Sequence, residues 1–144
     1  MKIHQISLFA ENKPGHIAAP VRLLEKEGID IRALYLADTE QFGIVRMIVS
    51  DWKKANAILA EHGFTVKVTE VLAVEVLDHP GGLADVLGEL DQTGINIEYM
   101  YAFPDVRAGK AILIFRFADP DVAIERLQTA GISLLTSDEL LKDQ

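Results

Sequence analysis

Two short stretches of the sequence combine proline, glycine and a polar side chain in a way that suits the binding of a small anion. Residues 11–17 read ENKPGHI, and residues 77–83 read LDHPGGL. In both, β-type residues stop at asparagine or aspartate, and a proline–glycine pair then leads into apolar residues at helical spacing. The pattern predicts a strand–turn–helix corner that is used twice.

Each corner has the chemistry of an anion-binding turn. Asn12 or Asp78 can bend the chain through its own side chain, proline fixes φ, and glycine lets another group approach the backbone. The first amides of the following helix have no intrahelical partner, and the helix dipole places partial positive charge there. Such a corner can hold a carboxylate. A proline–glycine pair can also merely start a helix, but its occurrence twice in one chain argues against that plainer interpretation.

The corners belong to an internal repeat that extends along the whole chain. The second proline–glycine pair lies 66 positions after the first, and the GINI of residues 94–97 lies 66 positions after the GIDI of residues 28–31. Beyond a longer loop predicted at residues 104–109, the offset grows to 68. A fixed period of this kind indicates a duplicated structural unit.

Each repeat is predicted to contain a strand, a helix, two strands, a second helix and a final strand. In the first repeat, Gly28 and Gly63 are expected to end the helices, and Asp51 to open the second one, with His62 on its inner face. Pro20 removes a hydrogen bond inside the first helix, so that helix should either kink or start late. The predicted strands of this repeat cover residues 2–9, 29–37, 42–49 and 64–71, with a turn at residues 38–41.

This order of elements describes a split β-α-β unit. The chain is therefore predicted to be an α+β protein with two ferredoxin-like βαββαβ repeats, residues 1–70 and residues 71–144. Each repeat should form an antiparallel four-stranded sheet with its helices on one face. The other face needs a cover, since Tyr99, Tyr101 and Phe103 share one side of a strand, and we expect the other repeat or a second chain to supply it.

Composition excludes several classes of partner. The 144 residues carry 22 acidic and 14 basic side chains, and the formal net charge of −8 repels nucleic acid and anionic membrane surfaces. The lack of cysteine excludes disulfides and thiolate metal sites, and the apolar runs are too short to span a bilayer. The sequence contains no phosphate-binding loop, dinucleotide fingerprint or hydrolase elbow. We therefore expect a cytoplasmic protein that is not an enzyme and uses no cofactor or metal.

The histidines are too scattered to predict a metal site. His4 and Glu75 would be the ligands if the chain were a metal-dependent lyase of the glyoxalase type, whose repeated modules have similar length. Those modules lack the second helix predicted here in each repeat, which argues against a lyase. Arg107 and Lys110 flank the predicted loop and are expected to be solvated rather than to contact a partner or an anion.

The paired motifs resemble those of the ACT domain, a small ligand-sensing module found on enzymes of amino-acid metabolism. The resemblance rests on NKPG followed by GIDI in the first repeat and on DHPG followed by GINI in the second, and it covers essentially the whole chain. It implies an amino-acid effector held at the interface between ACT units, near the corners. The physical reading agrees, because helix-start amides suit the carboxylate of an amino acid, and polar side chains suit its ammonium group.

The resemblance implies a stand-alone, non-catalytic regulatory protein, with a homodimer and a metabolic enzyme as candidate partners. The alternative is a ligand-free regulatory subunit of a separate amino-acid biosynthetic enzyme. The two repeats differ at the candidate positions, so their sites need not be equivalent. The residues implied to bind ligand are Asn12, Pro14, Gly15, His16, Ile17, Asp30, Asp78, Pro80, Gly81, Gly82, Leu83 and Asn96.

Overall fold

The computed structural model describes residues 1–38 and 42–142, which divide into two compact units. The first unit is His4–Thr69, and the second combines Met1–Ile3 with Glu70–Gln144. Of the predicted turn at residues 38–41, residues 39–41 lie outside the described part of the chain. None of the described helices is long and apolar enough to cross a membrane.

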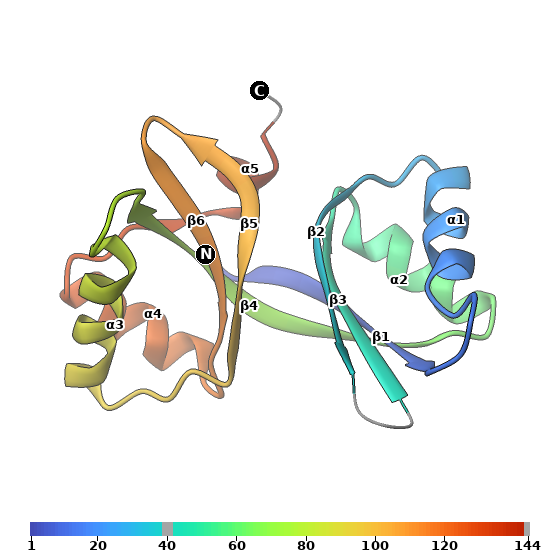
Figure 1. Cartoon of the computed structure of the whole chain (residues 1–144), viewed down its shortest axis with the longest axis horizontal. Helices are drawn as coiled ribbons and strands as arrows, with labels where there is room; N and C mark the ends of the chain where they lie inside the picture. Colours follow the sequence, from blue (N-terminus) through green and yellow to red (C-terminus); the bar gives the residue numbers. More distant parts are fainter. Residues whose placement is uncertain (39–41, 143–144) are drawn as a thin grey trace. The chain divides into compact units, whose positions relative to one another are not determined.

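The first unit is an antiparallel sheet with two helices on one face (Figure 1). Its strands follow the spatial order β2-β3-β1-β4, and β3 pairs antiparallel with both β1 and β2. Strand β4 continues from this unit into the next without a linker. The elements are β1 (Ile3–Glu11), α1 (Ala18–Lys26), β2 (Ile31–Asp38), β3 (Phe42–Val49), α2 (Trp52–Glu61) and β4 (Thr65–Leu77).

The second unit repeats this arrangement around the end of β4. Its strands follow the order β5-β6-β4, and a short β7 pairs with β4 on the other side. Helices α3 and α4 lie on one face of the sheet (Figure 1). The predicted α+β fold with two ferredoxin-like repeats is confirmed. The further elements are α3 (Gly82–Thr93), β5 (Tyr99–Arg107), β6 (Lys110–Arg116), α4 (Pro120–Thr129), β7 (Leu134–Leu135) and α5 (Ser137–Leu141).

Each unit has its own apolar core between its helices and its sheet. In the first, alternate residues of β1 such as Ile6 and Leu8 pack with Leu24 of α1 and Leu59 of α2. In the second, Phe115 of β6 and Phe117, just beyond the end of that strand, belong to an equivalent cluster. Period 2 along the strands and helical spacing along the helices place these side chains on the buried faces.

Helix α1 starts late, which resolves the conflict raised by Pro20. The helix begins at Ala18, so Pro20 is its third residue. Amides in the first turn of a helix have no intrahelical acceptor, so a proline at this position removes no hydrogen bond. At the other end, Gly28 adopts φ of 72° and its amide donates to Glu25, as in the predicted glycine-terminated helix end.

Two local expectations were wrong. His62 does not face the core: it is exposed just beyond the last residue of α2, and its Nδ1 lies 2.9 Å from the carbonyl oxygen of Ile58. The loop predicted at residues 104–109 is mostly strand, because β5 extends to Arg107 and only Ala108 and Gly109 form the turn. Both turn residues have positive φ, 51° and 76°, which suits a two-residue hairpin. A register shift between Phe103 and Val106 accommodates the additional residues of this repeat.

We predict opposite effects for two glycine substitutions in α3. A Cβ atom at Gly82 would lie 1.9 Å from the carbonyl oxygen of Leu77, whereas one at Gly88 would meet no heavy atom within 4 Å. Gly82→Ala should therefore lower the free energy of unfolding by more than about 1 kcal/mol, and Gly88→Ala should raise it by roughly 0.5–1 kcal/mol because alanine favours a helix. Urea unfolding followed by circular dichroism measures both. Equal stability of the two variants would contradict the close approach of α3 to β4.

Candidate ligand-binding site

The first corner connects the end of β1 to the start of α1. Residues Asn12, Pro14 and Gly15 are exposed, and His16 and Ile17 are half-buried. Gly15 adopts φ of 84°, a conformation in which any other residue is strained. The glycine is therefore required by the turn itself, in addition to any role in leaving the backbone accessible.

The second corner connects β4 to α3 in the same way. Asp78, Pro80, Gly81 and Leu83 are exposed, and Gly81 adopts φ of 94°. Gly82 is buried, because the first turn of α3 packs against the carbonyl oxygen of Leu77. The two corners thus share their exposure and their left-handed glycine.

The helices that follow the corners differ from the other helices in how they begin. Within the described part of the chain, no side chain caps the start of α1 or α3. In contrast, Asp51 accepts from the Lys54 amide at the start of α2, and Asp119 accepts from the Val122 amide at the start of α4. Uncapped helix amides that face solvent are free to bind an anion.

The opposite ends of α1 and α3 are closed by basic side chains. The Lys54 ammonium donates to the carbonyl oxygen of Glu27 over 2.9 Å, and the Arg126 guanidinium donates to the carbonyl oxygen of Thr93. Thr93 lies 66 positions after Glu27, so the two carbonyls are equivalent in the repeats. A cation there also opposes the negative end of the helix dipole.

The other two polar residues predicted to bind ligand, Asp30 and Asn96, come just after the C-terminal ends of α1 and α3. Asp30 is exposed, its amide donates to the Ser50 hydroxyl over 3.0 Å, and its carboxylate lies 3.8 Å from the Arg32 guanidinium. Asn96 occupies the equivalent position in the second unit and is also exposed. Both side chains are accessible to a ligand.

Within one unit, the structure does not bring the corner and the Gly-Ile-x-Ile segment together. At one end of β3, Phe42 pairs with Glu11 beside the corner, and at the other end Val49 pairs with Ile31. Strand β3 has eight residues, so these ends are about 24 Å apart at the usual rise of a strand. A single amino acid is far too short to touch both Asn12 and Asp30 of one unit.

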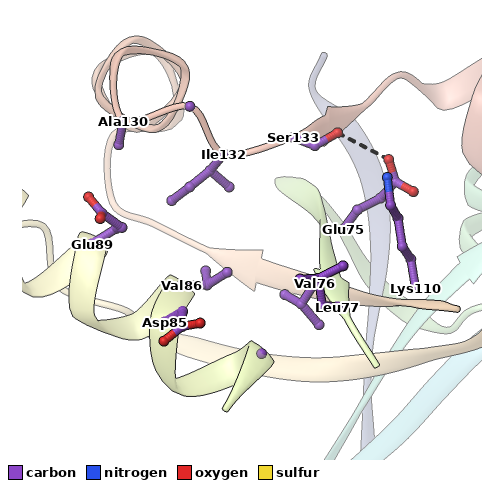
Figure 2. A pocket seen from close by; sticks show the side chains of 12 residues that line it. Glu75, Val76, Leu77, Asp85, Val86, Glu89, Lys110, Ala130, Ile132 and Ser133 are labelled. Carbon is purple, nitrogen blue, oxygen red and sulfur yellow. Dashed lines mark hydrogen bonds between the residues drawn. The ribbon is translucent and has the colours of Figure 1, made fainter. Parts of the chain in front are cut away.

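Each unit also contains a cavity beside its corner, and the two cavities occupy equivalent places. The first-unit cavity has a volume of about 650 Å³ and is lined by Phe9, Ala10, Glu11, Lys13, His16, Phe42, Gly63, Phe64 and Thr65. The second-unit cavity has a volume of about 330 Å³ (Figure 2) and is lined by Glu75, Val76, Leu77, Gly82, Asp85, Val86, Glu89, Lys110, Ala130, Gly131, Ile132 and Ser133.

Sequence reasoning missed most of the residues that line these cavities. Glu75 was considered only as a metal ligand, and Lys110 was expected to be solvated rather than to contact a partner or an anion, yet both line the second-unit cavity. The repeat offset could have revealed them: Glu75 lies 66 positions after Phe9, and Lys110 lies 68 positions after Phe42. The described residues contain no group of three or more histidine, aspartate or glutamate residues placed to hold a metal ion, and the His4 ring stacks on Trp52 at 4.3 Å.

Comparison with known proteins identifies the family. A family model described as an ACT domain pair matches residues 1–143. The chain belongs to the ACT domain pair family. The domains of this family are regulatory, non-catalytic modules, so membership supports a regulatory, ligand-binding role for the chain.

Solved structures share the fold of this ACT domain pair. The protein BT0572 from Bacteroides thetaiotaomicron is 38% identical with a TM-score of 0.91, and the match covers 99% of this chain and 98% of that one. The regulatory subunit of aspartate kinase from Thermus thermophilus, in its ligand-free form, is 19% identical with a TM-score of 0.60, over 88% and 91% of the two chains. The corresponding subunit from Thermus flavus is 19% identical with a TM-score of 0.57, over 91% and 94%. No curated protein matches the chain significantly.

We predict that the corner side chains contribute little to stability, in contrast to the capping side chains. The side chains of Asn12 and Asp78 are exposed and make no hydrogen bond or ion pair with other described residues, so Asn12→Ala and Asp78→Ala, which leave the hydrogen bond from the Asp78 amide to the Gly109 carbonyl in place, should change the free energy of unfolding by less than about 0.5 kcal/mol. Asp51→Ala and Asp119→Ala should each lower it by about 1 kcal/mol, because each removes a helix cap. Urea unfolding of the four variants tests this contrast, and a corner variant as unstable as a cap variant would contradict it.

Proposed function

We propose that this ACT domain pair is a non-catalytic, cytoplasmic sensor that binds an amino acid and regulates a partner. The observation that carries the proposal is the pair of uncapped helix starts, which occur at both corners while α2 and α4 are capped by their own aspartates. First-turn amides that no side chain caps suit the carboxylate of an amino acid. The side chains of Asn12 and Asp78, which make no hydrogen bond or ion pair with other described residues, suit its ammonium group.

We further propose that the effector is held where two ACT units meet. The corner and the Gly-Ile-x-Ile segment of one unit lie at opposite ends of a strand, so Asn12 and Asp30 of the same unit cannot both contact one amino acid. A second unit can supply the missing half. A homodimer is the common symmetric way to provide such a unit.

The second candidate function is that of a ligand-free regulatory subunit of a separate amino-acid biosynthetic enzyme. Leu34 and Leu36 on the edge strand β2 each expose 49% of their surface, and an exposed apolar edge favours contact with another protein. Two structures of similar fold are described as regulatory subunits of aspartate kinase. Under this function the protein would bind an enzyme whether or not an amino acid is present.

We predict that the full chain is stabilised selectively by one or a few amino acids. Thermal unfolding of the purified protein with each common amino acid should give a higher Tm for those that bind, because a ligand at 100 times its Kd adds about 2.7 kcal/mol to the free energy of unfolding. Divalent metals serve as the comparison series. A protein that responds to no amino acid but binds a biosynthetic enzyme would support the second function instead.

We predict that the same effector loses affinity when either half of the site is changed. Asn12→Ala, Asp78→Ala and Asn96→Ala each remove one polar contact, and a lost contact to a charged group weakens binding by roughly tenfold or more. Calorimetric titration of the effector measures the Kd of each variant. The matched control is Asp91→Asn on the exposed face of α3, which should bind normally, and wild-type affinity in all three site variants would contradict the proposed location.

A further inference from the structure

The second-unit cavity is lined by charged side chains on two sides, with apolar side chains between them that we call the apolar floor. Among the described residues that line it, Glu75, Asp85 and Glu89 carry carboxylates and Lys110 carries an ammonium. Figure 2 shows Asp85 and Glu89 of α3 on one side of the cavity, and Glu75 and Lys110 on the other. The apolar side chains between the two sides are Val76, Val86 and Ile132.

The side formed by the sheet is positioned by hydrogen bonds. The Ser133 hydroxyl donates to the Glu75 carboxylate over 3.0 Å, and the Glu75 amide donates to the Ser133 carbonyl over 3.0 Å. Lys110 pairs with Leu77, two residues along β4 from Glu75, so the side chains of Lys110 and Glu75 lie on the same face of the sheet. This side therefore offers a fixed anion with a cation close to it, which matches the head group of an α-amino acid.

The equivalent cavity of the first unit lacks this charged pair. Phe9 occupies the position of Glu75, and Phe42 occupies the position of Lys110. The threonine and serine that close the two cavities, Thr65 and Ser133, are equivalent and both polar. The first-unit cavity is instead lined by Glu11 and Lys13, which pair with each other at 3.5 Å, so a charged pair at the positions of Glu75 and Lys110 is particular to the second unit.

We propose that the second-unit cavity binds an α-amino acid whose aliphatic side chain ends in an ammonium group. Lys110 binds the carboxylate, Glu75 the α-ammonium, and Asp85 with Glu89 the ammonium at the end of the side chain, while the apolar floor contacts the methylene groups. The three carboxylates and one ammonium of the cavity then contact the two ammonium groups and one carboxylate of the ligand. This site lies within the second unit and is separate from the one proposed between two units; the inference rests on the proposed function only for the class of ligand and adds the charge of its side chain.

Three small molecules separate the parts of this recognition. Ornithine has all three charges, norvaline has the same carbon chain without the terminal ammonium, and putrescine is ornithine without its carboxylate. Calorimetric titration of the full chain should give the lowest Kd for ornithine. Norvaline and putrescine should each bind at least about tenfold more weakly, because each leaves one charged contact unmade. Ornithine binding no more tightly than norvaline would overturn the proposal.

Variants assign each contact to its residue. The double variant Asp85→Asn with Glu89→Gln should weaken ornithine about tenfold or more and leave norvaline unchanged, since both side chains are exposed and the changes preserve shape. Lys110→Met should weaken ornithine and leave putrescine unchanged. Asp91→Asn, on the same helix but outside the cavity, is the matched control for the loss of one charge and should leave all three affinities unchanged. Wild-type affinity for ornithine in the double variant would overturn the proposal.

The outcomes also separate this inference from the proposed function. If ornithine fails to bind but another amino acid raises the Tm, the inference is wrong and the proposed function stands. If no amino acid of any class binds, both are wrong. If putrescine binds as tightly as ornithine, the ligand of the cavity is a diamine rather than an amino acid, and the proposed contact of Lys110 with a carboxylate is wrong.

Discussion

The helix starts of α1 and α3, which no side chain caps within the described residues, are the feature on which the functional interpretation depends. A helix start leaves several amides without an intrahelical acceptor, and they must be satisfied by side chains, water or a ligand. The chain supplies a carboxylate for α2 and α4 through Asp51 and Asp119 but no capping side chain for α1 or α3 within the described residues. The opposite ends of α1 and α3 are closed by Lys54 and Arg126. Each of these helices is therefore fixed to its neighbour at one end and lacks a side-chain cap at the other.

Most of the fold could be predicted from the sequence because the signals were local and occurred twice. The helix ends at Gly28 and Gly63, the caps at Asp51 and Asp119, and the order of elements follow from short motifs and a repeat offset that changes only once, from 66 to 68. Pro20 left two possibilities, and only the structure distinguishes a late start from a kink. His62 was wrongly placed because helical spacing was extended one residue beyond the end of α2.

The candidate site was less predictable because distance in space does not follow from a motif. Asn12 and Asp30 belong to one family motif pair, yet the pairing of β1, β2 and β3 places them at opposite ends of the sheet. The cavity beside the second corner is formed by residues from separate elements, among them Glu75 and Lys110. No single stretch of the sequence contains enough of them to suggest a common site.

The second repeat contains two more residues than the first, and their place in the sheet limits what they change. They are accommodated entirely in β5, between Phe103 and Val106, at the edge of the sheet. The inner pairing is unchanged, since Lys110 lies opposite Leu77 as Phe42 lies opposite Glu11. An insertion of one residue in β6 would have turned alternate side chains to the other face. The outer strand thus gives the repeat a place to change length while the strand pairing beside its cavity stays the same.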